Sequence, residues 1–408
     1  MRKSRYIKIA AIFLATMLLA SVSFAGKRCP SSLVPDIPSV WTEIVPIEVY
    51  PDFEYNGLKP GCAACPGCNP EYSFFVKGGI KDNLVIYFEG GGACWDSMNC
   101  LYAPTYTQEV NVTADDLNNY TSGIFDTDNP NNPFNGWYYV FIPYCTGDIH
   151  WGAADTVYQD YLDQIPGVNS WTIHHRGFVN FQVVLKWVTD NFLWPRKIFV
   201  TGSSAGGYGA IMAFPYIKQA FPFSRVYVLG DAANGVIGED FQKSSIYNWN
   251  IQIPTWIPGF ENGYTPDITM EDVYVDIAHY YPFSKLAQFS SAWDWNQTFF
   301  YYVMLDLYNP GNWQTGWPSV WCDWHNQMYT YVHETADQAP NYRYYISAGQ
   351  YHTIMGSPQF YTENSAGELY NVWVRAMVRN PFGVFGGFLQ GKWENLECEE
   401  CQDPVPCQ

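Results

Sequence analysis

Positively charged residues are scarce in this chain. It has 21 lysines and arginines against 39 aspartates and glutamates, which gives a formal net charge of -18. Such an acidic surface repels polyanions, so the composition argues against binding to nucleic acids or to anionic membranes. Only 15% of the residues are charged while 48% are hydrophobic, which is typical of a globular protein with a large core.

Long apolar runs are almost absent. The one that stands out, "IAAIFLATMLLA", follows the basic stretch "MRKSRYIK" and is too short to span a bilayer comfortably. Small residues at Ser23 and Ala25 follow it. Residues 1–25 are therefore predicted to be a secretory signal peptide, with a membrane anchor helix as the alternative. The mature chain, with a net charge near -22 once four positive charges are removed, is expected to be secreted or periplasmic and to lack a membrane span.

Cysteine is plentiful, but its arrangement does not favour a metal site. All 11 cysteines follow the predicted signal peptide, and "CAACPGC" (62–68) has no fourth cysteine close by. In an exported chain the default interpretation is disulfide bonds, including in "CEECQDPVPC" (398–407). Because 11 is odd, at least one thiol is expected to be free or paired between chains. No metal and no cofactor is predicted.

Internal repeats and long low-complexity linkers are absent, so residues 26–408 are predicted to form one domain. Between helix-like stretches such as 180–192 lie apolar runs typical of strands. These runs are "NLVIYFEGGG", "KIFVTGSSAGG", "RVYVLGDAANG", "KLAQFSSAWD" and "NYRYYISAGQYH". Strands that alternate with helices predict an α/β fold with a mostly parallel sheet. Two long segments, about 233–284 and 305–340, are rich in aromatic residues and are predicted to act as lids.

The turn in "KIFVTGSSAGGYGAIMAF" carries the first chemical signal. It holds a G-x-S-x-G pattern centred on Ser204, between a predicted strand and a predicted helix. A strained turn of this kind exposes a nucleophilic serine above a sheet, and Ser203 beside it serves as a small filler. The alternative is a structural or phosphate-binding turn, but the Gly-Lys-Ser/Thr of a P-loop is missing.

A nucleophilic serine needs a base and an acid that orients the base. His352 directly follows the last predicted strand, at the edge where α/β-hydrolases place their base, whereas His279 and His325 lie in the two long segments. Two acids end strands, Asp231 and Asp294. Asp294 is preferred because it lies on the later strand, nearer in sequence to His352.

Acyl transfer also needs N–H donors directed at the developing oxyanion. Gly90, Gly91 and Gly92 end a predicted strand and resemble the HGGG-type loop of esterases, with Glu89 in place of the histidine. The N–H of Ala205, directly after the serine, would supply a further donor. Asp231 and Trp95 are additional candidates for the substrate pocket.

Several blocks together resemble the pectin acetylesterase family, which includes the animal carboxylesterase Notum. They are "EGGGACWDSMNC", "PYCTGDIHWG", "HHRGFVNFQVVLKWV", "TGSSAGGYGA", "GDAANG" and "FSSAWDWNQ". This resemblance implies an α/β-hydrolase with the catalytic residues Ser204, Asp294 and His352 and an oxyanion hole of Gly91, Gly92 and Ala205. It also implies a disulfide between Cys94 and Cys100, and one from Cys145 to Cys62, Cys65 or Cys68.

The predicted function is that of a secreted serine carboxylesterase that removes O-acetyl groups from a polysaccharide. One alternative keeps the chemistry and changes the substrate to longer acyl esters, as in a lipase-like or polyester-degrading enzyme. Another is an inactive protein that binds carbohydrates or surfaces through its tryptophan-rich segments. The net charge fits poorly with polygalacturonate, which is itself a polyanion.

Overall fold

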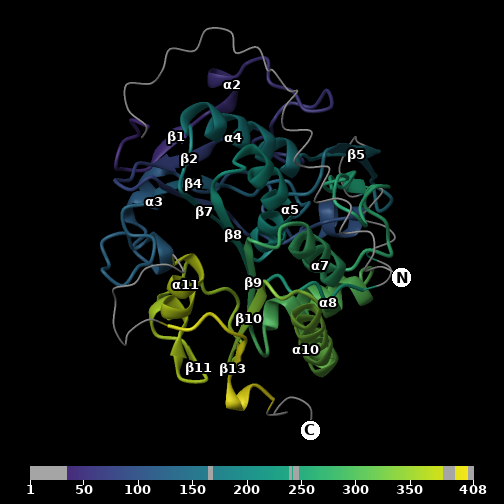
Figure 1. Cartoon of the computed structure of the whole chain (residues 1–408). Helices are drawn as coiled ribbons and strands as arrows, with labels where there is room; N and C mark the ends of the chain where they lie inside the picture. Colours follow the sequence, from purple (N-terminus) through teal and green to yellow (C-terminus); the bar gives the residue numbers. More distant parts are fainter. Residues whose placement is uncertain (1–34, 164–168, 239–240, 242–247, 380–390, 403–408) are drawn as a thin grey trace. The chain divides into compact units, whose positions relative to one another are not determined.

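A nine-stranded sheet forms the centre of the molecule in the computed structural model (Figure 1), which describes residues 35–163, 169–238, 241, 248–379 and 391–402. The predicted signal peptide, residues 1–25, lies outside these residues. The strand order is β1-β2-β4-β3-β7-β8-β9-β10-β13. The strands are β1 (Thr42–Ile44), β2 (Phe74–Lys77), β3 (Asn83–Phe88), β4 (Tyr138–Ile142), β7 (Lys197–Ser203), β8 (Arg225–Asp231), β9 (Lys285–Ser291), β10 (Tyr342–Ser347) and β13 (Leu396–Glu397).

The sheet is mostly parallel, as the sequence predicts. Only β2 pairs in the antiparallel sense, with β1 on one side and β4 on the other, while all remaining pairs are parallel. The five apolar runs identified in the sequence are β3, β7, β8, β9 and β10. These strands are buried almost throughout because helices cover both faces of the sheet, which explains their continuous apolar character.

Helices pack on both faces of the sheet. One face is covered by α4 (Gly177–Asn191), α5 (Ala205–Ala220), α7 (Met270–Tyr280), α8 (Trp295–Leu305) and α10 (Trp321–Gln338), and the other by α3 (Ala114–Asn119) and α11 (Tyr370–Val378). Figure 1 shows α11 on one side of β9 and β10, with α7 and α10 on the opposite side. The arrangement confirms the predicted α/β fold class, and α4 contains the predicted helix 180–192 apart from its last residue.

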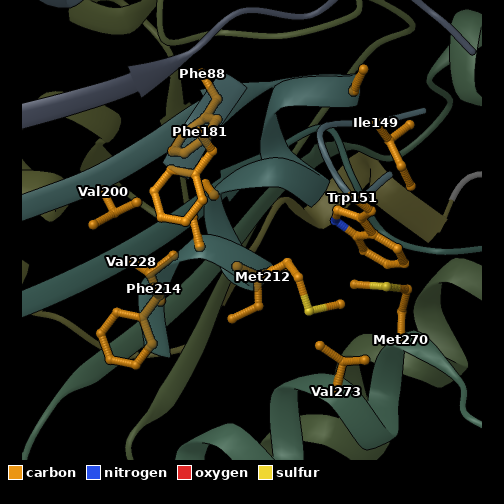
Figure 2. Close-up of a cluster of buried hydrophobic side chains, with 14 of the residues drawn as sticks. Phe88, Ile149, Trp151, Phe181, Val200, Met212, Phe214, Val228, Met270 and Val273 are labelled. Carbon is orange, nitrogen blue, oxygen red and sulfur yellow. The ribbon is translucent and has the colours of Figure 1, made fainter. Parts of the chain in front are cut away.

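The larger core lies between the sheet and the first group of helices. Figure 2 shows Val200 of β7 and Val228 of β8 close to Phe181 of α4 and to Met212 and Phe214 of α5. All five side chains are buried. Because such interiors are close-packed, this core holds the turn between β7 and α5 in a fixed position.

Shorter elements fill the connections. A hairpin is formed by β5 (Ala154–Gln159) and β6 (Ser170–His175), and a smaller one by β11 (Asn364–Ser365) and β12 (Glu368–Leu369). The short helical turns are α2 (Pro46–Val49), α9 (Trp313–Gly316), the π-helical η2 (Met98–Tyr102), and the 3-10 turns η3 (Gly123–Phe125), η4 (Pro310–Asn312), η5 (Trp317–Val320), η6 (Pro358–Tyr361) and η7 (Glu399–Gln402).

The two segments predicted to be lids contain parts of the scaffold. Helix α7 lies within 233–284 and connects β8 to β9, and α10 lies within 305–340 and connects β9 to β10. Residues 239–240 and 242–247 lie outside the described chain. The stretches that precede α7 and α10 remain the predicted lids, and the second consists largely of the short helical turns η4, α9 and η5.

Disulfide bonds are present, as expected. They join Cys62 to Cys145, Cys65 to Cys68, Cys94 to Cys100 and Cys398 to Cys401, and Cys322 is also disulfide-bonded. The predicted Cys94–Cys100 bond is confirmed, and Cys145 has Cys62 as its partner. Such bonds fit an extracellular protein. Among the described helices, none is both long enough and apolar enough to cross a membrane.

Candidate active site

Ser204 lies at the sharp turn between β7 and α5. Its backbone has φ 58° and ψ -125°, in the left-handed half of conformational space that non-glycine residues rarely adopt. The Ser204 N–H donates to the carbonyl oxygen of Asp231 at 2.7 Å, which ties the turn to the end of β8. This is the geometry of a nucleophile elbow.

The two glycines of the G-x-S-x-G pattern are required by close packing. A Cβ atom on Gly202 would collide with the carbonyl group of Gly206, and one on Gly206 would collide with the carbonyl oxygen of Phe88 at the end of β3. The glycines therefore let strand, turn and helix approach one another around Ser204.

His352 and Asp294 lie together at the same edge of the sheet. The His352 Nδ1 atom lies 2.8 Å from Asp294 Oδ2 and 3.0 Å from Oδ1. The other ring nitrogen of His352, Nε2, is buried and has no hydrogen-bond partner among the described residues. Ser204 and His352 line the same cavities, so Nε2 is the atom available to act on the serine.

Asp294 is held rigidly. It is the N-cap of α8, where its Oδ1 atom accepts the N–H groups of Asn296 and Gln297 at 2.9 Å. The Gln297 side chain donates to Oδ2 at 2.9 Å. Three donors and the histidine thus fix a carboxylate that is completely buried. Gln297 had not been identified from the sequence, although it stands in the quoted block "FSSAWDWNQ".

Asp231, the other candidate acid, has different partners. Its carboxylate accepts the Ser203 hydroxyl at 2.6 Å and the N–H groups of Ile354 and Met355 at 2.9–3.0 Å. It therefore connects the turn at Ser204 with the loop that carries His352, without bonding to the histidine ring. Ser203 is more than the small filler expected from the sequence, because it donates to Asp231 and accepts from the Tyr87 hydroxyl.

Burial and two carboxylates act on His352 in opposite directions. Burial lowers the pKa of His352, but the negative charge of Asp294, its hydrogen bond, and the more remote charge of Asp231 raise it, so the pKa lies above its usual value. Burial also raises the pKa of Asp231, to about 6. The carboxylates therefore stabilise the imidazolium that forms when His352 takes a proton.

The loop after β3 lies against the nucleophile turn. A Cβ on Gly90 would clash with Ser203 and Ser204, which places the bare backbone of the loop directly beside the serine. Gly92 has φ 77°, and among the described residues no acceptor takes the N–H groups of Gly91 or Gly92. Ala205 is the first residue of α5, so its N–H has no acceptor within the helix. These three groups are available to an oxyanion beside Ser204.

Two pockets meet at Ser204. One is an open cleft of about 790 Å³ and the other a more enclosed pocket of about 60 Å³. Both are lined by Gly92, Ser204, Asn296, Phe300 and His352. Asn296 stands in the quoted block "FSSAWDWNQ", whereas no local pattern indicated Phe300, which lies on α8 and reaches the site only through the fold.

The two pockets differ in character. Polar and aromatic side chains line the cleft, among them Thr105, Trp313 and Gln314. The small pocket is lined mainly by apolar residues such as Ile149, Val236, Ile237, Phe241, Met304 and Trp324. The arrangement can hold an ester with its alcohol part in the cleft and its acyl part in the small pocket.

Other residues considered from the sequence lie outside these pockets. Trp95 is buried and packs its ring on Phe241 at 4.7 Å, so it supports the wall of the small pocket from behind. His325 stacks on Trp293 at 3.8 Å, and its Nδ1 lies 2.7 Å from the Ala292 carbonyl oxygen. His279 contacts the Gln338 carbonyl oxygen. His325 is thus a buried packing residue, and His279 is an exposed residue on the surface of α7.

One group of side chains has the composition of a metal site. Ligand atoms of Cys94, Cys100 and His175 lie within 4.8 Å of one another. The two sulfur atoms are joined in a disulfide, and the His175 nitrogens contact the Thr146 carbonyl oxygen and the Tyr158 hydroxyl at 2.8 Å. The donors are therefore engaged with one another and with the protein.

Comparison with known proteins points to the same chemistry. Residues 58–250 match the model of the family described as Pectinacetylesterase. The predicted resemblance is confirmed. A curated relative, Pectin acetylesterase 11 of Arabidopsis thaliana, is 23% identical over 193 residues, a match that covers 47% of each chain. The chain thus spans about half the length of this relative. Pectin acetylesterases are carboxylic ester hydrolases, the class of enzyme that the sequence predicts.

The matched segment contains only part of the candidate site. It includes the loop with Gly91 and Gly92 and the turn with Ser204, whereas Asp294 and His352 lie beyond residue 250. The catalytic roles of these residues therefore remain predictions, which rest on the geometry described above.

Proposed function

We propose that this protein is a secreted serine esterase that removes O-acetyl groups from a polysaccharide. The observation that carries the proposal is the convergence of Ser204, His352 and Asp294 at the junction of two pockets, with the Asp294–His352 hydrogen bond at 2.8 Å. Beside them lie N–H groups for which no described residue is an acceptor. The family match over residues 58–250 supports the same chemistry.

In the proposed reaction, His352 Nε2 takes the proton of the Ser204 hydroxyl as Oγ bonds to the ester carbonyl carbon. The N–H groups of Gly91, Gly92 and Ala205 donate to the resulting oxyanion. As the tetrahedral intermediate collapses, the alcohol leaves with the proton from His352 and the acetyl group stays on Ser204. His352 then deprotonates a water molecule, which attacks the acetyl carbon. As the bond from this carbon to Ser204 Oγ breaks, His352 returns the proton to Oγ and acetate is released. Asp294 keeps Nδ1 protonated and stabilises the imidazolium.

The small pocket supports a short acyl group. It is far smaller than the cleft, and mainly apolar side chains line it. This fits the methyl end of an acetyl ester and disfavours a long acyl chain. The open cleft, more than ten times larger, can receive the sugar that carries the ester.

We also propose that residues 1–25 direct the chain out of the cytoplasm and are removed. The disulfide bonds support this, because such bonds persist in oxidising compartments.

The test compares Ser204→Ala with Ser203→Ala in hydrolysis of p-nitrophenyl acetate. We expect Ser204→Ala to lower kcat by at least about 10⁴-fold, with an unchanged circular dichroism spectrum. Ser203→Ala removes a neighbouring hydroxyl but leaves the nucleophile, so a substantial part of the activity should remain. Wild-type activity in Ser204→Ala would refute the proposal, and a wild-type protein inactive on every ester would favour the binding-protein alternative.

A further inference from the structure

Three tyrosines from distant parts of the chain gather next to the cleft. Tyr102 ends η2, Tyr161 follows β5, and Tyr308 follows α8. The rings of Tyr102 and Tyr161 lie 5.1 Å apart in an edge-to-face arrangement. The Tyr308 hydroxyl donates to Asp96 at 3.3 Å, and the Tyr102 hydroxyl donates to Asp160 at 2.7 Å. We call these five residues the tyrosine rim.

The tyrosine rim lies next to the open cleft, because two of its tyrosines are close in sequence to residues that line the cleft. Ala103, Pro104 and Pro310 line the cleft. Tyr102 directly precedes the first two of these residues, and Tyr308 stands two residues before Pro310. Consecutive Cα atoms lie about 3.8 Å apart, so both tyrosines stand within about 8 Å of cleft-lining residues. A polymer whose acetylated sugar enters the cleft would pass over this rim.

The rim tyrosines remain accessible. Tyr161 is 50% exposed and Tyr308 is 64% exposed, although large aromatic side chains usually bury more of their surface. Partial burial and the nearby charge of Asp96 raise the pKa of Tyr161 to about 12, so the phenol stays neutral at physiological pH. A neutral tyrosine offers an apolar ring face together with a polar hydroxyl, which suits the mixed surface of a sugar.

The charge at the cleft is negative or absent. Asp96 and Asp160 contribute carboxylates to the rim, and none of the described residues that line the cleft is a lysine or an arginine. The whole chain carries a net charge of -18. A polyuronate bears one negative charge per sugar and would be repelled, whereas carboxylates readily accept hydrogen bonds from the hydroxyls of an uncharged sugar.

We propose that the tyrosine rim binds the sugars that flank the acetylated residue, and that the substrate is an uncharged acetylated polysaccharide rather than a polyuronate. This inference rests on the proposed function, since it names the polymer on which that esterase acts. Tyr161 and Tyr308 provide stacking surfaces, while Asp96 accepts sugar hydroxyls and disfavours anionic chains.

The first experiment compares wild-type kcat/KM on acetylated xylan and on acetylated polygalacturonate, both expressed per acetyl group, with p-nitrophenyl acetate as the reference. At low ionic strength we expect acetylated xylan to be preferred by about tenfold or more. Added salt should raise the relative rate on polygalacturonate, because it screens the repulsion. An equal rate on the two polymers, or a preference for polygalacturonate, would overturn the proposal.

The second experiment tests the rim directly. The double variant Tyr161→Ala/Tyr308→Ala should lose about fivefold to tenfold in kcat/KM on acetylated xylan, with the rate on p-nitrophenyl acetate unchanged. Trp194 and Phe223 make a matched control, since they are 50% and 73% exposed, lie 5.3 Å apart, and precede the amino ends of β7 and β8. Trp194→Ala/Phe223→Ala should leave both rates unchanged. An equal loss on xylan in the two double variants would contradict a specific rim.

A third variant tests the charge. Asp96→Asn keeps the Oδ1 acceptor for the Met98 N–H and removes the negative charge. It should raise the rate on acetylated polygalacturonate severalfold at low salt and leave p-nitrophenyl acetate hydrolysis unchanged. No increase would contradict the role of Asp96. These failures are distinct from failure of the esterase proposal, in which p-nitrophenyl acetate is not hydrolysed at all.

Discussion

The two ends of the same parallel strands carry residues of opposite character. At the carboxyl ends stand Ser204, Asp231, Asp294 and His352. The two carboxylates are buried; Asp294 is bonded to His352 and to backbone N–H groups, and Asp231 to Ser203 and to backbone N–H groups. Their neighbourhood also holds strained backbone at Ser204 and at Thr353, which has φ 64°. This edge carries the proposed chemistry, and its two carboxylates are fixed before a substrate arrives.

At the amino ends, β7, β8 and β9 each begin with a cation. Lys197 and Lys285, which begin β7 and β9, donate to the carbonyl oxygens of Val378 and Ala376 in the last turn of α11. Carbonyl groups at a helix end lack partners within the helix and favour positive charge. In this sheet, the residues proposed for catalysis stand at the carboxyl ends of the strands, and residues that stabilise the fold stand at the amino ends.

Of the two carboxylates at the carboxyl ends of the strands, Asp294 should matter more for activity, and Asp294→Asn should cause the largest loss of kcat. Since Asp294 bonds to the His352 ring, this change should lower kcat on p-nitrophenyl acetate by about 10³- to 10⁴-fold. Asp231→Asn should cost less than about 100-fold, because Asp231 positions the two loops without touching the ring. A larger loss for Asp231→Asn would reverse the assignment of the acid.

A smaller loss is expected in the loop beside the serine. Gly92→Ala places a Cβ where φ is 77° and where it would collide with the Thr105 carbonyl oxygen, so the N–H of residue 92 should move. Removal of one oxyanion donor costs about 10²- to 10³-fold in kcat. Gly57→Ala is the matched control, since Gly57 has φ 78° but open space around it. Steady-state kinetics should show a loss for Gly92→Ala alone, and equal losses would refute the oxyanion role.

The pH dependence of activity should show how the two nearby carboxylates raise the pKa of His352. The base must be neutral, and its pKa is raised, so kcat/KM should fall as the pH drops through a midpoint above 6.5. In the residual activity of Asp294→Asn this midpoint should shift to lower pH, because the strongest influence that raises the pKa is gone. A midpoint that stays in place would show that another group titrates.

The smallest effect is expected at the amino edge. Lys197→Met removes a cation from the last turn of α11 and should lower the free energy of unfolding by about 1 kcal/mol. Urea denaturation measures this change, and kcat/KM should equal that of the wild type. A loss of activity without a loss of stability would contradict the separation of the two edges.

Local patterns in the sequence predict much of this molecule. Continuous apolar runs identify β3, β7, β8, β9 and β10, because strands buried on both faces must be apolar throughout. The spacing of glycines around Ser204 predicts the turn, since both glycines are required by close packing. His352 follows the last of these strands, and the fold brings it to the same cavity as the serine.

Features that depend on long-range packing could not be predicted. Asp231 ends β8, whereas Asp294 stands three residues after β9, and the choice between them depends on which carboxylate reaches the His352 ring. Trp95 was expected in the pocket, but Phe241 stands between it and the cavity. The tyrosine rim joins residues as far apart as Asp96 and Tyr308, so no local spacing indicates it.

The central claim is that Ser204 is the nucleophile of an ester hydrolase. Its most direct test is mass spectrometry of the intact, folded protein after treatment with a fluorophosphonate, followed by peptide mapping. One adduct per chain should form, on Ser204, with loss of p-nitrophenyl acetate hydrolysis in proportion to labelling. An adduct on Ser203, or an active protein that is never labelled, would contradict the account.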